Sequence, residues 1–166
     1  AIGTYHLTGR TLALLRERGE LAQLPADECA IVRAAALLHD VGHYPFSHAL
    51  EEIGALHHEA VARTLITGGE IASVLASTIG ANAAMRAHAI ITGESASPLQ
   101  GLISGSLDLD KIEYLKRDAH MCGVPYGEID VDRLLHSLTI VEDPKSGAPA
   151  IGLVEKGLAA LESLLF

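Results

Sequence analysis

The sequence contains little cysteine, no long apolar run and a deficit of positive charge. Only Cys29 and Cys122 are present, far too few for a disulfide-stabilised scaffold, which indicates a reducing, intracellular compartment. No apolar run approaches the roughly 20 residues that span a bilayer, and no signal-peptide pattern is visible. We therefore expect a cytoplasmic protein with no membrane partner.

The charge balance limits the kinds of partner. The 12 Lys and Arg residues against 21 Asp and Glu residues give a formal net charge of -9. Such a surface would repel a long polyphosphate backbone, so we expect no extended nucleic-acid surface. A small anionic ligand held by a few cations and a metal ion is still compatible, because local charge decides that case.

Hydrophobic spacing predicts a mainly α fold. The apolar stripe of a first helix, which Gly19 closes, contains Leu7, Leu12, Leu14 and Leu15. The segment CAIVRAAALLHD is a nearly all-round apolar helix that should be central and end at Gly42. Further helices are predicted at about 47–55, 57–67, 70–79, 81–92, 98–121 and 130–138. Two β-prone runs around a turn rich in Pro and Gly predict a small hairpin at about 139–154.

The domain organisation follows from length and pattern. At 166 residues the chain is about one domain's worth. It opens on Ala1 within a helical pattern and stops at Phe166 within another. We expect residues 1–166 to be one compact helical domain excerpted from a longer chain.

Polar side chains interrupt the central apolar helix in LLHDVGHYPFSH, residues 37–48. His39 and Asp40 are adjacent, and His43 lies four residues after His39. If the helical turn persists, His39 and His43 fall about 40° apart on one face. Imidazole and carboxylate ligands suit a divalent ion such as Mn, Fe, Co or Zn. Alternatively, Asp40 caps or pairs with a histidine and His43 is a satisfied core residue.

A second polar group lies on the predicted helix SLDLDKIEYLKRDAH. Helical spacing places five polar side chains in one arc, opposite an apolar face: Asp110, Lys111, Tyr114, Arg117 and Asp118. This is either an ordinary solvated face or a row of groups that binds metal, phosphate and sugar in sequence.

Histidine–carboxylate pairs occur between these two regions. His48 and Glu51 are three residues apart on a predicted helix, and His58 and Glu59 are adjacent. A histidine near neutral pH can donate a proton to a leaving oxygen, as phosphoester cleavage requires. A single histidine is more often structural, and we expect this of His57, His88, His136 and, at a helix C-terminus, His120.

Taken together, HDVGHYPFSHALE, HHE and LDLDKIEYLKRDAHMCGVPYG resemble the HD-domain phosphohydrolases, and within them the deoxynucleoside triphosphate triphosphohydrolase branch with its bacterial dGTPase-like enzymes. The resemblance extends from Ala1 to about Leu138. His-Asp alone is weak evidence, whereas these motifs in this order are specific. The resemblance implies a compact helical HD-domain bundle, a homo-oligomer, and hydrolysis of a deoxynucleotide substrate to deoxynucleoside and tripolyphosphate.

The resemblance also implies residue roles. His39, Asp40 and Asp110 would bind a divalent metal ion (Mn, Mg, Fe, Co or Zn). His43 would contact the triphosphate near the metal ion. The scissile α-phosphate would face His48 with Glu51 and His58 with Glu59, and one of these two histidines would protonate the leaving 5′ oxygen. Lys111 would contact phosphate, Tyr114 the deoxyribose and Asp118 the 3′-hydroxyl.

One departure from the family pattern concerns the first metal-binding histidine, which would immediately precede Ala1. His6 cannot replace it, because six residues turn the helix by about 240°. Two alternatives to the triphosphohydrolase stay open. One is another HD phosphohydrolase, acting on nucleotide monophosphates, cyclic nucleotides or alarmones. The other is a catalytically silent nucleotide-binding regulatory module.

Overall fold

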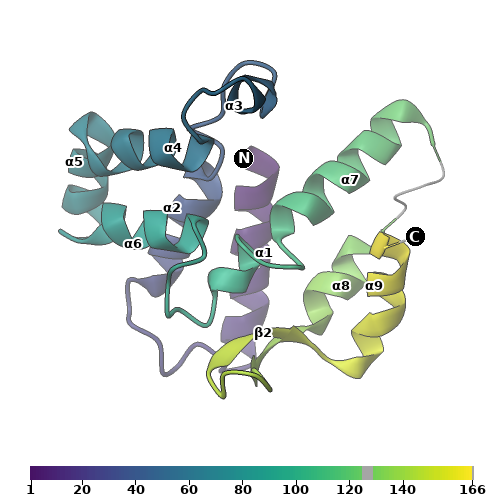
Figure 1. The fold of residues 1–166 in the computed structure, drawn as a ribbon. Coiled ribbons are helices and arrows are strands. Elements are labelled where there is room, and N and C mark those ends of the chain that lie inside the picture. Colours follow the sequence, from purple (N-terminus) through teal and green to yellow (C-terminus); the bar gives the residue numbers. More distant parts are fainter. Residues whose placement is uncertain (125–128, 166) are drawn as a thin grey trace.

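The computed structural model describes residues 1–124 and 129–165 and is mainly helical (Figure 1). Both the mainly α class and the small hairpin are confirmed. The Pro125, Tyr126 and Gly127 positions of the GVPYG motif lie outside the described residues. The elements are α1 (Ile2–Glu17), α2 (Glu28–Leu38), α3 (Ala49–Glu52), α4 (His58–Thr67), α5 (Gly69–Thr78), α6 (Ala83–Ile91), η1 (Gln100–Leu102), α7 (Leu109–Cys122), α8 (Val131–Ser137), β1 (Leu138–Glu142), β2 (Pro149–Leu153), η2 (Glu155–Gly157) and α9 (Leu158–Leu165).

Helix α1 runs through the middle of the molecule, between α2 on one side and α7 and α8 on the other (Figure 1). Its buried stripe contains Leu7, Leu12 and Leu15, as the spacing predicts, whereas Leu14 is only partly buried. Three fully buried threonines share this helix, and two of them donate hydrogen bonds back to the preceding turn: Thr8 to Thr4 O and Thr11 to Leu7 O. Thr4 is the exception, because its hydroxyl bonds outside the helix.

Helix α2 is central, as its apolar sequence predicts. Ile31, Val32, Ala35 and Ala36 are fully buried, and the helix packs against α1 and α6. It ends earlier than expected, with His39 as the C-terminal capping residue. From there the chain continues in tight turns, which keep the following polar residues close to the helix end.

Two helix predictions were wrong in extent. The expected helix at 47–55 is reduced to α3, because Phe46 and Ser47 have left-handed backbone angles, with φ of 68° and 56°, which a right-handed helix cannot include. The expected helix at 98–121 is interrupted between η1 and α7. Asp108 is extended there, and its carboxylate accepts a 2.7 Å hydrogen bond from the Lys111 N–H, which starts a new helix.

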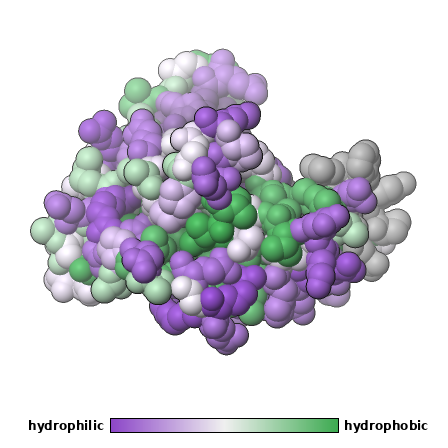
Figure 2. Space-filling model, turned by 90° about the horizontal axis from the view of Figure 1, so that it is seen from below, coloured by the Kyte–Doolittle hydropathy of each residue, from purple (hydrophilic) through white to green (hydrophobic). Residues whose placement is uncertain are grey.

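The antiparallel hairpin pairs Leu138 with Leu153 and Glu142 with Pro149. It lies at the lower end of the molecule, and Figure 2 shows hydrophobic surface on this lower face among hydrophilic side chains. Val154 and Leu158, which follow the hairpin, are 40% and 50% exposed. Across residues 1–124 and 129–165, no helix is both long and apolar enough to cross a membrane.

Candidate active site

His39 lies between two carboxylates that come from different parts of the chain. Its Nε2 atom is 3.2 Å from Oδ2 of Asp40 and 3.3 Å from Oδ1 of Asp110. His39 and Asp40 follow α2, whereas Asp110 is in the first turn of α7. The fold thus brings together the three residues that the sequence marks as candidate metal ligands, and their ligand atoms all lie within 4.8 Å of one another.

The hydrogen bonds of His39 suit a metal ligand. Its Nδ1 donates to the Ala36 carbonyl at 2.9 Å, which fixes the tautomer and directs Nε2 to the carboxylates. Nε2 is buried, yet it lacks a hydrogen-bond partner of acceptable geometry. A buried polar atom without a partner is costly. A divalent ion held by His39, Asp40 and Asp110 would satisfy it.

These three side chains also control one another's protonation. Burial would lower the pKa of His39, but the carboxylates of Asp110 and Asp40 outweigh this effect and raise it to about 10. The imidazole of His39 in turn lowers the pKa of Asp110 to about 2, against the opposing effect of burial, and it lowers the pKa of Asp40. Without a metal ion, a proton on His39 therefore balances the two acids.

Thr4 orients Asp110, a role that the sequence reasoning missed. The Thr4 hydroxyl is fully buried and donates a 2.9 Å hydrogen bond to Oδ1 of Asp110. Gly3 lies against the end of the Glu113 side chain on α7, where a Cβ atom would lie 2.3 Å from that carboxylate and would require it to move. The signal available in the sequence was a threonine within the apolar stripe of the first helix.

We expect Thr4→Val to weaken binding of Mn²⁺ by about 10- to 100-fold, the usual effect of losing a group that orients a metal ligand. Valine keeps the shape of the side chain but cannot donate the hydrogen bond to Asp110. Thr4→Ser retains the hydroxyl and should bind nearly as the wild type does. Isothermal titration calorimetry compares the three proteins, and equal affinity of Thr4→Val and the wild type would contradict this role.

A cluster of imidazoles continues from Asp40. His43 lies 3.5 Å from Asp40 through Nε2, and its ring stacks on that of His58, with centroids 4.2 Å apart. The ring of His48 meets that of His43 edge-on at 4.8 Å. Burial, followed by the charge of His58, lowers the pKa of His43. The fold thus brings together three of the expected catalytic histidines.

Gly42 permits this stacking. A Cβ atom at this position would lie 2.1 Å from the backbone oxygen of His58 and 2.6 Å from the backbone nitrogen of Ala62. Only glycine fits such a close approach of two backbones. The loop after α2 therefore lies directly on the start of α4, which places His43 against His58.

Glu51 anchors the cluster. Its Oε1 accepts hydrogen bonds from the backbone N–H of His58 at 2.9 Å and from Nδ1 of the same residue at 2.8 Å. Oε2 is 3.5 Å from Nδ1 of His48. Burial opposes ionisation, but the two hydrogen bonds from His58 prevail and lower the pKa of Glu51 to about 2.

The pairing of His58 differs from the expected one. Glu51, rather than the adjacent Glu59, holds its Nδ1 atom. Glu59 instead approaches Nδ1 of His57 at 3.6 Å. Proximity in sequence was misleading here, because consecutive residues at the start of α4 point in different directions.

The candidate nucleotide-binding residues follow Asp110 along α7. Lys111 is exposed, with Nζ 3.5 Å from the Asp108 carboxylate. Tyr114 is half-buried one turn later. Asp118 is 63% exposed and lies 3.5 Å from the Arg117 guanidinium. These three side chains line one stretch of the helix beyond the candidate metal ligand.

Comparisons with known proteins agree with this geometry. The family model described as HD domain matches residues 8–114, a range that contains His39, Asp40 and Asp110. A crystal structure of a phosphohydrolase from Bacteroides thetaiotaomicron superposes with a TM-score of 0.77 at 29% sequence identity, covering 98% of this chain and 38% of that one.

Two curated relatives are also informative. An uncharacterised protein of Methanocaldococcus jannaschii is 39% identical over 136 residues, which are 81% of this chain and 27% of the relative. A Dictyostelium discoideum protein named deoxynucleoside triphosphate triphosphohydrolase SAMHD1 homolog is 26% identical over 161 residues, which are 86% of this chain and 30% of the relative. The chain thus spans about a third or less of the length of these relatives.

HD domains bind divalent metal ions, and the chain carries groups of His, Asp and Glu side chains that could hold one. The family match covers more than half of the chain, and the solved phosphohydrolase shares its fold. The protein therefore belongs to the HD-domain phosphohydrolase family.

Proposed function

We propose that this HD domain hydrolyses deoxynucleoside triphosphates to deoxynucleosides and tripolyphosphate. The observation that carries the proposal is the buried Nε2 of His39, 3.2 Å from the Asp40 carboxylate and 3.3 Å from that of Asp110, beside a cluster of imidazoles. The name of the Dictyostelium discoideum relative supports a deoxynucleoside triphosphate as the substrate.

His39, Asp40 and Asp110 would hold the metal ion, which could be Mn, Mg, Fe, Co or Zn. When bound, such an ion neutralises phosphate charge and lowers the pKa of a water ligand. His43, which contacts both Asp40 and His58, lies where it can also contact the phosphates. The three ligands and the imidazole cluster thus form one continuous polar surface.

Proton delivery to the leaving 5′ oxygen is assigned to the imidazole cluster. Glu51 holds Nδ1 of His58, which leaves Nε2 of that ring to exchange a proton with the substrate. His48 is 58% exposed and lies against the same carboxylate, so it can serve the same purpose. The Glu59 carboxylate lies beside His57 rather than beside His58.

Recognition of the nucleotide is assigned to α7. Lys111 makes one long ion pair, which a phosphate group could replace. Tyr114, one helical turn after Asp110, would lie against the deoxyribose, where a ribose 2′-hydroxyl would clash. Asp118, one turn further on, would accept a hydrogen bond from the 3′-hydroxyl.

The test uses the full-length protein that contains this chain. It is incubated with each deoxynucleoside triphosphate and Mn²⁺, and the products are analysed for tripolyphosphate. We expect tripolyphosphate from the wild type and none from Asp110→Ala. Release of orthophosphate or pyrophosphate would contradict the proposal in favour of another phosphohydrolase activity. Thermal stabilisation by nucleotide without any product would instead indicate a binding module.

A further inference from the structure

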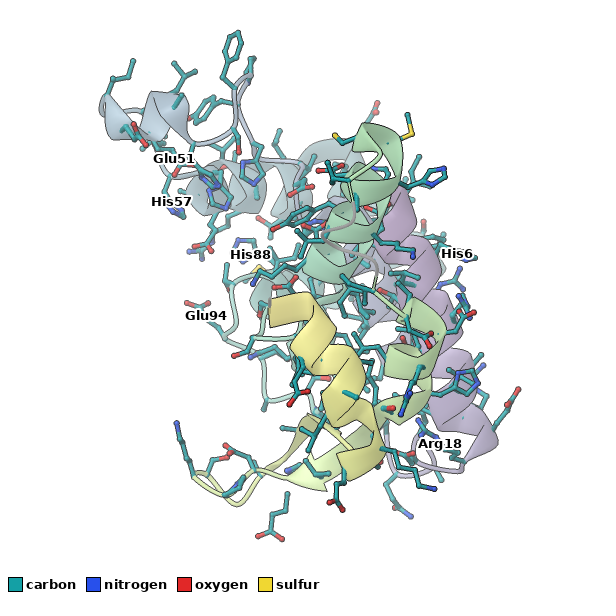
Figure 3. All side chains as sticks on the ribbon, turned by 90° about the vertical axis from the view of Figure 1, so that its right-hand side faces the viewer. His6, Arg18, Glu51, His57, His88 and Glu94 are labelled. Carbon is teal, nitrogen blue, oxygen red and sulfur yellow. The ribbon has the colours of Figure 1, made fainter. Side chains whose placement is uncertain are left out.

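A second group of metal-type ligands lies at the outer side of the imidazole cluster. Glu51, His57 and His58 each place a ligand atom within 4.8 Å of the others. Oε2 of Glu51 is 3.6 Å from Nε2 of His57, and the rings of His57 and His58 have centroids 4.4 Å apart. Figure 3 shows Glu51 and His57 next to one another. His57 has no part in the proposed reaction.

Glu59 lies beside the second ring nitrogen of His57. Its Oε2 lies 3.6 Å from Nδ1 of His57, on the opposite side of the ring from Glu51. When an ion binds Nε2, the ring proton is on Nδ1, beside the Glu59 carboxylate. Histidine ligands of metal ions usually direct their other ring nitrogen at a carboxylate, a backbone carbonyl or water.

The spacing fits a tetrahedral ion. Ligand atoms about 2.0–2.2 Å from Zn²⁺ lie roughly 3.3–3.6 Å from one another, close to the 3.6 Å between Glu51 and His57. The third ligand, Nδ1 of His58, is 2.8 Å from the same carboxylate through a shared proton. An ion would displace that proton and separate the two atoms slightly.

Access and charge also suit a cation. The His57 side chain is 57% exposed, so an ion can enter from solvent, whereas Glu51 and His58 are 14% and 17% exposed and would shield it on the inner side. The N-terminus of α4 opposes a positive ion, because the helix dipole is positive there. The carboxylates of Glu51 and Glu59 offset this effect.

We propose that Glu51, His57 and His58 form a second cation site, distinct from His39, Asp40 and Asp110, that binds Zn²⁺ or a similar imidazole-preferring ion. Two imidazoles and one carboxylate favour zinc over magnesium or calcium. A further consequence rests on the proposed function. An ion at this site occupies Glu51 and Nδ1 of His58, so it inhibits hydrolysis.

Zinc titration of the metal-stripped full-length protein tests the site. Calorimetry should resolve two Zn²⁺-binding events that are lost on substitution of residues in this domain. Asp110→Asn should remove one event and His57→Asn the other, and anomalous diffraction at the zinc edge should place the second ion at His57. His136→Asn, which changes an exposed histidine on α8, should retain both events. If His57→Asn still shows both binding events, the proposal is wrong. If it retains only the event at His39, Asp40 and Asp110, the variant is folded and has lost the second site.

Inhibition is measured separately, in the protein loaded with Mn²⁺. Micromolar Zn²⁺ should slow the wild type by at least about tenfold, and His57→Asn should keep the uninhibited rate in the same titration. Equal inhibition of both proteins would overturn the inhibitory role. If no deoxynucleoside triphosphate is hydrolysed, the proposed function fails, and the binding titration still decides whether the site exists.

Discussion

Replacing Glu51 with glutamine is expected to slow hydrolysis by about 100- to 10,000-fold, the usual contribution of general acid–base catalysis. The Glu51 carboxylate accepts two hydrogen bonds from His58 and stays ionised, because its pKa is lowered to about 2. Glutamine keeps the length of the side chain but removes the charge that stabilises a protonated imidazole. The rate is measured as tripolyphosphate released at saturating Mn²⁺.

The matched control for this change is Glu52→Gln. Glu52 is the next residue on α3 and is exposed, so this substitution removes the same charge without touching His58. We expect Glu52→Gln to retain nearly the wild-type rate, and both variants to bind Mn²⁺ normally, since Glu51 is not among the ligands proposed for the catalytic ion. A rate for Glu51→Gln within threefold of the wild type would refute the role of Glu51.

Binding of Mn²⁺ is expected to strengthen about tenfold for each unit of pH between pH 6 and 9, or roughly a thousandfold over this range. In the metal-free protein the carboxylates of Asp110 and Asp40 outweigh burial and raise the pKa of His39 to about 10. Nδ1 donates to Ala36, so the additional proton occupies Nε2, the nitrogen that must bind the metal ion. Each ion therefore displaces about one proton.

Calorimetry in two buffers with different ionisation enthalpies measures this proton release directly. We expect about one proton per ion near neutral pH and a smaller number as the pH approaches 10. His136→Asn, which changes an exposed histidine on α8, serves as the control and should show the same pH dependence as the wild type. Affinity that does not change with pH would contradict the assignment of His39 as a ligand.

Loss of the His39 proton at high pH favours metal binding but destabilises the metal-free protein. The folded-state pKa of His39 lies above its value of about 6.5 in the unfolded chain. The stabilisation from this proton is therefore complete below about pH 6.5 and is lost as the pH rises toward 10. Urea unfolding at several pH values, with and without Mn²⁺, should show the metal-free protein weakening and the metal-bound protein gaining relative stability.

Local patterns in the sequence predicted the secondary structure where tertiary contacts did not interfere. The apolar spacing of α1 and α2 and the turn of the hairpin are properties of neighbouring residues, so periodicity and turn chemistry are sufficient. The expected helix at 98–121 is interrupted, because the Asp108 carboxylate accepts a hydrogen bond from the Lys111 N–H and so starts a new helix. The expected helix at 47–55 failed because the chain must turn sharply at Phe46 and Ser47 before α3.

The candidate site was predictable only in part. The adjacency of His39 and Asp40 can be read from the sequence, and the resemblance to HD-domain proteins nominated Asp110. Neither indicated Thr4, because a hydrogen bond between α1 and α7 depends on how the two helices pack. The partner of His58 was also misjudged. Glu51 precedes His58 by seven residues, and only the folding of the chain between α3 and α4 brings the two side chains together.

The sequence by itself determined the helical class, the hairpin and the kinds of ligand available, because these depend on side-chain chemistry and on spacing within a few residues. Tertiary structure alone decided which ligands meet. The packing of α1 on α7 places Thr4 on Asp110, and Gly42 allows two backbones to approach closely enough to place His43 on His58. The pKa values of His39 and Glu51 follow from their contacts in the folded chain, because burial and neighbouring charges exist only there.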